Sequence, residues 1–386
     1  MNEKKGVFVR NKGIFDSVFA NYKFDDIYKE IAISLILIFL VNCSENTNET
    51  DIEPSWKLVE ELDYANKIIL NSYVTTDSMY YYLSTHRGFW EYEQGDLEPD
   101  LRYNYGNAIT QTLEYKPVIS DSISAYLSED KTEIRLGLNR SQYDVILEII
   151  SVWDIDSTFS DNARFAMSYF RNPVGAFNDN NQFLTVVESG SGQSFCLINY
   201  SFDDSYSGIK INQLQNIYSF SPHFIYKNIL SFSSNFFIAL NTAPYMVYPS
   251  GETKEIEDIP WSCLEFFTYK NDLYGYTSNF EIYVTYDSGE NWEFYAHISA
   301  WVSFFEVSGR LCCHRHDDIH EVDFVNEEVR ELDNWGLEGN EITSINEFNG
   351  RVYISTLSGL FYRDIDEFFT YKDAEEKSSI ELEKIK

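Results

Sequence analysis

Short runs of apolar residues, broken by Gly, Asn, Asp and Ser, recur along the chain from about residue 55 onward. The runs are rich in Ile, Val, Phe and Tyr, residue types that favour strands. Many of them end in dipeptides such as Asn349-Gly350 and Ser308-Gly309, which suit two-residue hairpins. No long run with the helical period of 3.6 stands out after residue 52. The pattern therefore predicts an all-β protein, with inner strands at 229–232, 263–269, 302–307 and 342–348.

One strand–turn–strand unit repeats along the sequence. Residues 82–90 (YLSTHRGFW) match residues 353–361 (YISTLSGLF) in register, and both contain a Gly in the turn. Five further copies of the same shape lie between them, at 122–138, 183–200, 236–248, 273–283 and 311–321. The average interval is about 45 residues, a period that is typical of repeats built from one small sheet each. Seven units are therefore expected, and six or eight remain open.

The stretch 285–292 reads TYDSGENW and lies between two apolar runs. Thr285, Asp287, Gly289 and Trp292 fit the pattern Ser/Thr-x-Asp-x-Gly-x-x-Trp, so the stretch resembles the Asp box, or BNR repeat, of β-propellers such as sialidases and sortilin-like receptors. The Asp carboxylate can accept backbone N–H groups of the turn, and Gly supplies a positive φ. The Trp can cover the seam between neighbouring sheets.

The repeat period and this resemblance together predict a β-propeller over residues 55–372, with four strands in each blade, named a to d from the axis outward. Residues 56–62 (WKLVEEL) precede the first unit. We expect them to pair with the final blade, because such a closing strand removes an exposed sheet edge. The charged residues 373–386 are expected to form a solvated tail.

The N-terminal part has the features of an export signal. The run 31–41 is apolar except for Ser34, which suits the core of a signal peptide and is too short to span a bilayer. It ends in Leu-Val-Asn-Cys43, which resembles a bacterial lipobox. The resemblance implies a signal peptide over 1–42, a lipidated Cys43, a flexible tether over 43–54, and anchoring to the bacterial cell envelope, at the outer membrane or the cell surface. The alternative is a short buried helix with an incidental cysteine.

The net charge bears on the expected partners, and the cysteines bear on possible disulfides. The net charge is −33, and a surface this acidic repels phosphate backbones, so nucleic acid is not an expected partner. We find no phosphate-binding Gly loop, no Gly-x-Ser-x-Gly and no His-Glu-x-x-His, so no cofactor is predicted. Export would permit disulfides, and buried free thiols are equally consistent. The cysteines concerned are Cys196, Cys263, Cys312 and Cys313.

The segment 312–320 (CCHRHDDIH) is the richest in candidate chemistry. Thiolate and imidazole together are a zinc-type ligand set, but the repeat alignment places 316–318 in a turn and no second ligand pair is found, so no metal site is predicted. His316 and His86 occupy the same position of the repeat. The resemblance to propellers implies that the b–c and d–a loops share the face that usually binds ligands. Candidate binding residues in these loops would then form a rim on that face. Ordinary surface polarity is the simpler alternative. The candidates are His86, Arg87, His316, Asp317 and Asp318.

We expect a membrane-anchored binding or scaffold module for a protein or a glycan, and no catalytic residue is assigned. One alternative is a glycan-active enzyme, a sialidase-like hydrolase or a lyase, with its site at the central channel. Hydrolase chemistry would need two convergent carboxylates there. Residues 169–173 (YFRNP) faintly resemble the Arg-containing motif of sialidases, with Asn172 as a departure. Another alternative is an assembly factor of a membrane complex. Oxygen-rich loops at 96–100 and 178–181 are explained as turns rather than calcium sites.

Overall fold

The structure is a computed structural model in which the chain divides into Met1–Glu53 and Pro54–Lys386, and the fold below is that of the second unit. The described residues are 53–59, 69–74, 78–83, 88–93, 100–104, 118–128, 130–138, 146–166, 175–190, 192–203, 208–220, 226–372 and 378–384. Cys43, His86, Arg87 and residues 169–173 lie outside them.

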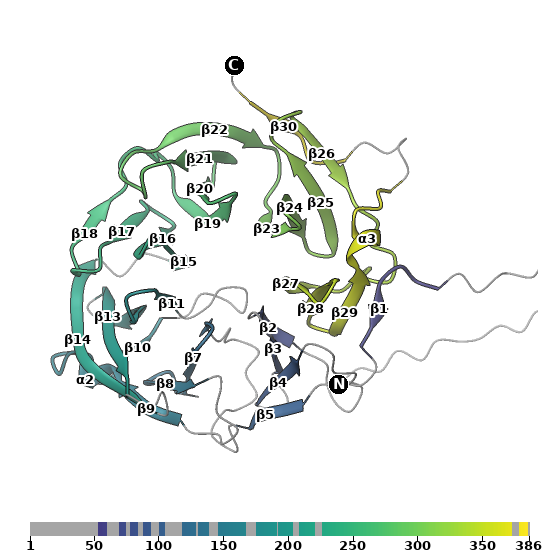
Figure 1. The fold of residues 1–386 in the computed structure, drawn as a ribbon. Helices are drawn as coiled ribbons and strands as arrows, with labels where there is room; N and C mark the ends of the chain where they lie inside the picture. The colour runs from purple at the N-terminus through teal and green to yellow at the C-terminus, as the bar shows by residue number, and fades with distance from the viewer. Residues whose placement is uncertain are drawn as a thin grey trace, which may run out of the picture. The chain divides into compact units, whose positions relative to one another are not determined.

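The described strands form seven antiparallel sheets set around a central axis (Figure 1). We number the sheets 1 to 7 in chain order. Sheets 1 to 3 consist of β2 (Ile69–Val74), β3 (Ser78–Leu83), β4 (Gly88–Glu93) and β5 (Asp100–Asn104); β6 (Val118–Ile119), β7 (Ile123–Leu127), β8 (Glu133–Leu138) and β9 (Ile146–Ser151); and β11 (Gly175–Asn178), β12 (Gln182–Ser189), β13 (Gly192–Phe202) and β14 (Ile209–Phe220), with β10 (Arg164–Phe165) also paired to β12.

Sheets 4 to 6 have the same a-to-d order. They consist of β15 (Tyr226–Phe232), β16 (Asn235–Leu240), β17 (Tyr245–Val247) and β18 (Thr253–Glu255); β19 (Cys263–Tyr269), β20 (Asp272–Thr277), β21 (Glu281–Thr285) and β22 (Glu293–Ile298); and β23 (Ser303–Val307), β24 (Arg310–Arg315), β25 (Asp318–Asp323) and β26 (Glu328–Glu331). Sheet 7 consists of β27 (Ile342–Phe348), β28 (Arg351–Thr356), β29 (Gly359–Asp364) and β1 (Lys57–Leu58). Two short helices, α2 (Val152–Ile155) and α3 (Ile365–Phe368), follow β9 and β29.

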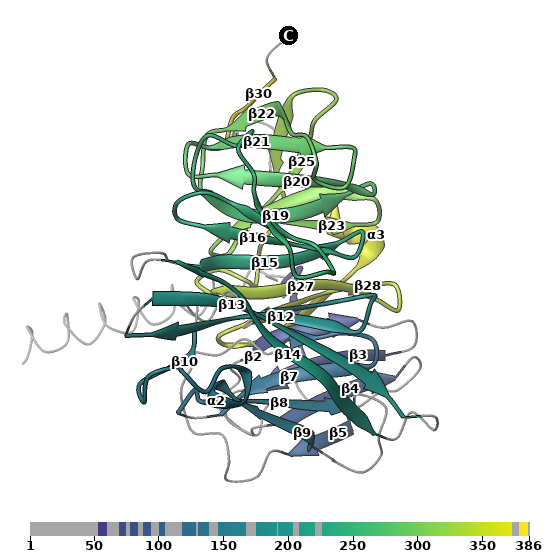
Figure 2. The ribbon, with the colours of Figure 1, turned by 90° about the vertical axis from the view of Figure 1, so that its left-hand side faces the viewer.

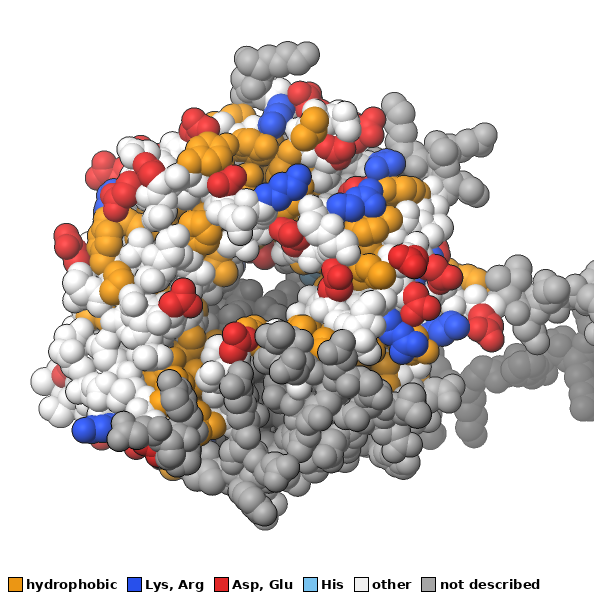
Figure 3. All heavy atoms as spheres, viewed as in Figure 1, with side chains coloured by type: hydrophobic (Ala, Val, Ile, Leu, Met, Phe, Trp, Pro, Cys, Tyr) orange, Lys and Arg blue, Asp and Glu red, His pale blue; other side chains and the backbone are white. Residues whose placement is uncertain are grey.

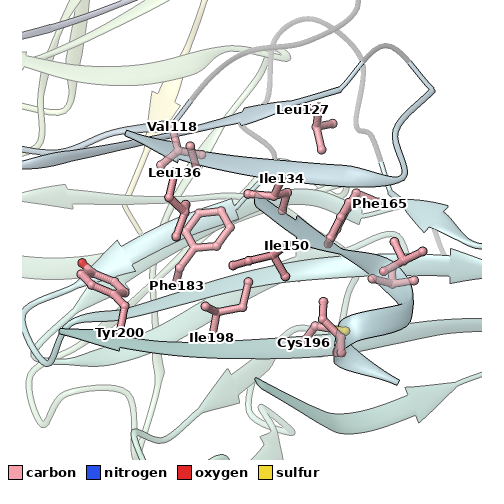
Figure 4. Close-up of a cluster of buried hydrophobic side chains, with 14 of the residues drawn as sticks. Val118, Leu127, Ile134, Leu136, Ile150, Phe165, Phe183, Cys196, Ile198 and Tyr200 are labelled. Atoms are coloured by element: carbon pink, nitrogen blue, oxygen red, sulfur yellow. The ribbon is translucent and has the colours of Figure 1, made fainter. Parts of the chain in front are cut away.

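Sheets 3 to 7 bury both of their faces, because successive residues of a strand point to opposite sides. Phe236 packs into the core between sheets 3 and 4, whereas Phe237 packs into the core between sheets 4 and 5. Six such hydrophobic clusters each join two neighbouring sheets. Figure 4 shows the cluster between sheets 2 and 3, where Leu136 and Ile150 meet Phe183 and Ile198. A sheet of this kind needs a neighbour on either side.

The ring is closed by the start of the described chain, as the sequence predicted. Strand β1 pairs antiparallel with β29, so the outermost strand of sheet 7 comes from the opposite end of the fold. Trp56, just before β1, is 2% exposed and meets Phe368 edge to face at 6.0 Å. Its indole N–H donates to the carbonyl of Asp333 at 3.1 Å. The closing strand is thus held by an aromatic anchor as well as by its ladder.

A buried polar cluster joins sheets 1 and 7. Ser72 of β2 accepts hydrogen bonds from Asn346 Nδ2 (2.6 Å) and Ser355 Oγ (2.9 Å), and shares a third with Ser344 (2.7 Å). Since a hydroxyl has one proton and two acceptor positions, Ser72 donates to Ser344 and its capacity is filled. Thr343 adds a buried bond of 2.6 Å to the carbonyl of Ile69.

The end of the chain differs from the expected solvated tail. Leu382–Glu383 form β30, which pairs with β22 and extends sheet 5. Ile380 and Leu382 are buried in the core between sheets 5 and 6, and Tyr371 bridges Leu332 at sheet 6. The sequence expectation was wrong here because the few apolar residues of a highly charged segment fit the outer edges of two sheets.

The fold is therefore an all-β propeller. Among the described residues no helix has the length and apolar character that crossing a membrane requires.

Replacing Trp56 with Ala should lower the free energy of unfolding by about 3–5 kcal/mol, the usual cost of removing a large buried aromatic side chain. Chemical denaturation followed by circular dichroism measures it. The matched control is Trp153→Ala, because Trp153 is 39% exposed, and it should change the free energy by less than about 1 kcal/mol. Equal effects of the two substitutions would rule out the anchoring role of Trp56.

Candidate binding face

The connections of the ring fall on two opposite faces. Because strands a to d alternate in direction, the b–c and d–a connections share one face, here called the loop face, and the a–b and c–d connections share the other, called the turn face. Helix α2 belongs to a d–a connection and α3 follows a c strand, and Figure 2 places them on opposite sides of the ring. Figure 3 views the turn face, where acidic and basic side chains are interspersed around a central hollow.

Among the tryptophans whose side chains the structure describes, four are exposed, and all four lie on d–a connections of the loop face. They are Trp153 (39% exposed), Trp261 (47%), Trp301 (63%) and Trp335 (40%). Of the other tryptophans among the described residues, Trp56 and Trp292 are buried. Exposed tryptophans gathered on one face are unusual for a surface that meets only water, because this side chain carries a large apolar area.

The aromatic surface is densest beside sheet 5. Phe280, in the b–c turn between β20 and β21, has its ring 6.3 Å from that of Trp301 and 6.2 Å from that of His297. The same turn is tied to the connection that carries Trp261, because Ser278 N–H donates to the carbonyl of Ser262 at 2.9 Å. The turn of sheet 5 is therefore flanked by an exposed tryptophan on either side in the chain.

The predicted residues of sheet 6 lie on the loop face, where they order the neighbouring loop. His316 and Asp317 form the b–c turn between β24 and β25, and Asp318 begins β25. His316 Nδ1 lies 2.8 Å from Glu341 Oε2, and Asp317 Oδ2 accepts the backbone N–H of Gly339 at 2.6 Å. These contacts fix the d–a connection that carries Trp335, so His316 and Asp317 position an exposed aromatic residue.

The thiols and imidazoles of 312–320 point to different places. Cys312 belongs to the core between sheets 6 and 7, and Cys313 to the core between sheets 5 and 6. His320 is buried, and burial lowers its pKa, so it is neutral near pH 7. The described residues contain no group of three or more His, Cys, Asp or Glu arranged to hold a metal.

All four cysteines of the described chain are free and buried. Burial raises the pKa of Cys196, Cys263, Cys312 and Cys313, which keeps the thiols protonated. Of the two readings that the sequence left open, free thiols are therefore the one observed. Buried protonated thiols are poor nucleophiles and poor ligands.

A small cavity opens on the loop face of sheet 3. It is lined by Asn162, Arg164, Gln193 and the turn that joins β12 to β13. Arg164 Nε and Glu188 Oε1 are 3.0 Å apart, and both side chains are partly exposed. Glu188 is the sole carboxylate among the described lining residues. A glycan hydrolase needs a pair of carboxylates, so this cavity does not have the composition of such a site.

The turn at 285–292 lies on the turn face, between β21 and β22. Asp287 Oδ1 accepts the backbone N–H of Asn291 at 3.0 Å and the hydroxyl of Thr285 at 2.8 Å. Gly289 has φ of 97°, and a Cβ there would lie 2.3 Å from the ring of Phe237. Trp292 is buried against Phe237 of sheet 4 and the neighbouring core. The turn thus locks the seam between sheets 4 and 5.

The b–c turns were predicted from the sequence, whereas the exposed tryptophans were not. A signal was available, because Trp261 and Trp301 each stand within two residues of a predicted inner strand, at the position where a d–a loop ends. The oxygen-rich segment 178–181 is a turn, with Asn178 Oδ1 accepting the backbone N–H groups of Asn180 and Gln182.

Comparison with known proteins agrees with the fold. No protein-family model matches the sequence, and no curated protein matches it. Among solved structures, the chain is similar to a catalytically inactive virginiamycin B lyase from Staphylococcus aureus, with a TM-score of 0.52 and 11% identity over 80% of this chain and 98% of that one. YCF48 bound to D1 peptide gives a TM-score of 0.48 and 10% identity, over 81% of this chain and 97% of that one.

The WD40 propeller domain of Doa1 gives a TM-score of 0.46 and 10% identity, over 80% of this chain and 96% of that one. At 11% identity the likeness to the lyase shows the β-propeller fold alone.

The stability that Asp287 provides should depend on pH. Hydrogen bonds from Asn291 and Thr285 lower its pKa to about 2 from an ordinary value of 3.8. A carboxylate with a lowered pKa in the folded state stabilises above its ordinary pKa and loses that effect as the pH falls. The melting temperature of the wild type should exceed that of Asp287→Asn most above pH 4, and the difference should shrink between pH 4 and pH 2. A constant difference over this range would contradict the assignment.

Proposed function

We propose that this protein is a binding module that recognises a protein partner through the loop face of its propeller. The observation that carries the proposal is the position of Trp153, Trp261, Trp301 and Trp335, all exposed and all on d–a connections. Tryptophan is enriched among the residues that dominate protein–protein binding energy, since it offers a large contact area with few rotatable bonds. A face rich in exposed tryptophan fits that role.

The spread of these side chains favours a macromolecular ligand. Trp153 lies between sheets 2 and 3, whereas Trp335 lies between sheets 6 and 7. A ligand that contacts all four must extend over most of the ring, and a stable protein interface covers about 800 Å² of each partner. A single sugar unit would meet only one of them.

A glycan remains the second candidate because of one local arrangement. Phe280 and Trp301 place two aromatic rings 6.3 Å apart beside sheet 5. Neighbouring aromatic rings offer apolar faces to the apolar face of a sugar ring. A free oligosaccharide that binds there would perturb Trp301 and leave Trp153 and Trp335 unchanged.

We further propose that the turn at 285–292 is an Asp box and that Cys43 carries the lipid that anchors the chain to a bacterial cell envelope. The hydrogen bonds of Asp287 and the burial of Trp292 support the first proposal. The sequence around Cys43 supports the second, and polar residues 44–54 would be the tether that holds the propeller away from the bilayer. A role in assembling a membrane complex is compatible with both.

Replacing Trp301 with Ala should weaken partner binding about 30-fold, because a central tryptophan contributes about 2 kcal/mol or more to such an interface. The measurement is co-purification from solubilised native membranes, followed by titration of the recovered partner. Tyr286→Ala is the matched control, since Tyr286 is equally exposed at 63% but lies on the turn face. If both substitutions leave the recovered partner unchanged, the loop face is not the binding face.

Replacing Cys43 with Ser should release the protein from the membrane fraction. A single acyl chain binds only weakly and stable anchoring takes more than one chain, so removing the acylated cysteine abolishes the attachment. Fractionation and intact-mass analysis of the native protein measure it, and Cys196→Ser is the control because that thiol is buried. Membrane attachment that survives Cys43→Ser would exclude the lipid anchor.

A further inference from the structure

The outer strand of sheet 3 is unusual in length. Strand β14 has 12 residues, whereas the d strands β18 and β26 have three and four. Within the described part of the chain it pairs with β13 alone. Figures 1 and 2 show it running along the outer wall of the ring. A long outer strand presents a row of backbone groups ready to pair with another strand.

Other outer edges of the same ring are covered by the chain itself. The outer position of sheet 7 is filled by β1, and the d strand of sheet 5 is extended by β30. At sheet 6, Tyr371 bridges Leu332, just beyond β26. Among the described residues, strands from the two ends of the fold thus complete or extend the outer side of two of the seven sheets. Strand β14 offers the longest such edge among the described strands.

The sequence of β14 contains no acidic residue, and one described carboxylate bonds to the strand, because Asp156 Oδ2 accepts a hydrogen bond from Asn216 Nδ2 at 3.1 Å. No Asp or Glu occurs between Asp204 and Glu252, although the chain has 62 of them in 386 residues. Within β14 the sole charged residue is Lys210, and its exposed side chains include Asn212, Gln213 and Tyr218. In Figure 3 the sector that contains β14 is mostly white, while acidic side chains gather around sheets 5 to 7.

This distribution favours one partner above others. Two copies of a chain with a net charge of −33 repel each other over most of their surfaces. The acid-poor sector around β14 is where two copies meet with the least repulsion. A strongly basic partner, in contrast, would be drawn to the acidic sheets and not to β14.

We propose that β14 pairs antiparallel with β14 of a second copy, so that two propellers share one continuous sheet. A two-fold axis at the middle of β14 makes the contact self-complementary. It places the uncharged residues 211–218 of the two strands opposite each other, and Lys210 opposite the uncharged Ser219 of the partner strand. Backbone hydrogen bonds then hold the pair, as they do when any strand is added to a sheet edge.

The test introduces negative charge without changing shape. In the double variant Asn212→Asp, Gln213→Glu, both copies gain acidic groups along the shared edge, where like charges oppose pairing. Sedimentation velocity of the full chain over a range of concentrations should show a dimer for the wild type. The dimer dissociation constant should rise about tenfold or more in the variant. Added salt should tighten the wild-type dimer by screening the repulsion between the two rings.

The control adds the same charge elsewhere. The double variant Asn271→Asp, Asn349→Asp changes two exposed a–b turns far from β14 in the chain, and it should dimerise like the wild type. A single Gln213→Cys should cross-link two copies with a short bismaleimide, because the native thiols of the described chain are buried. A monomeric wild type, or a dimer insensitive to the β14 charges, would overturn the proposal, as would a strand of another protein found on β14.

Discussion

The contact between the first and last sheets is the one on which the rest of the structure depends. Hydrophobic clusters fill six seams between neighbouring sheets, so opening the ring at the seam between sheets 7 and 1 would expose two apolar surfaces. The seam between sheets 1 and 7 combines the hydrophobic cluster around Ile69 and Leu360 with the hydroxyl of Ser72, which makes all the hydrogen bonds it can. Strand β1 then adds the outermost strand of sheet 7. Closure of the ring fixes the positions of the loops, and hence of the candidate binding face.

Much of the fold could be predicted from the sequence because strand alternation and turn residues act locally. The a strands at 263–269 and 342–348 and the turns that follow them were found from their residues alone. Neighbouring aromatic pairs such as Phe236-Phe237 signal a strand buried on both faces. The closing role of the segment that begins at Trp56 could also be predicted, since an apolar segment before the first repeat can be buried by pairing with the last sheet.

The C-terminal segment could not be predicted in the same way. Its buried residues, Ile380 and Leu382, stand among charged neighbours, and only the outer edges of sheets 5 and 6 give them a partner. The candidate site was predicted in part. His316 and Asp317 lie on the expected face, but their partners Glu341 and Gly339 show that they shape a loop. The exposed tryptophans of that face were not predicted, because the exposure of a loop side chain depends on the three-dimensional path of the loop.

Three surfaces of one ring thus have different physical characters. The loop face carries exposed tryptophans, the turn face carries the tightly bonded turn around Asp287, and the outer wall carries the long strand β14, which has no acidic residue of its own. The hydrophobic core is divided into separate clusters between neighbouring sheets. The three surfaces are therefore not coupled through one shared core. Substitutions on one surface are therefore expected to leave the others unchanged.

Hydrogen exchange of the backbone amides, read by mass spectrometry, tests the closure most directly. If β1 completes sheet 7, the amide of Val59, which donates to the carbonyl of Leu360 at 2.8 Å, exchanges only when the whole propeller unfolds, at the same rate as the bonded amides of β20 and β21. Rapid exchange of the Val59 amide while the rest of the ring stays protected would contradict the account.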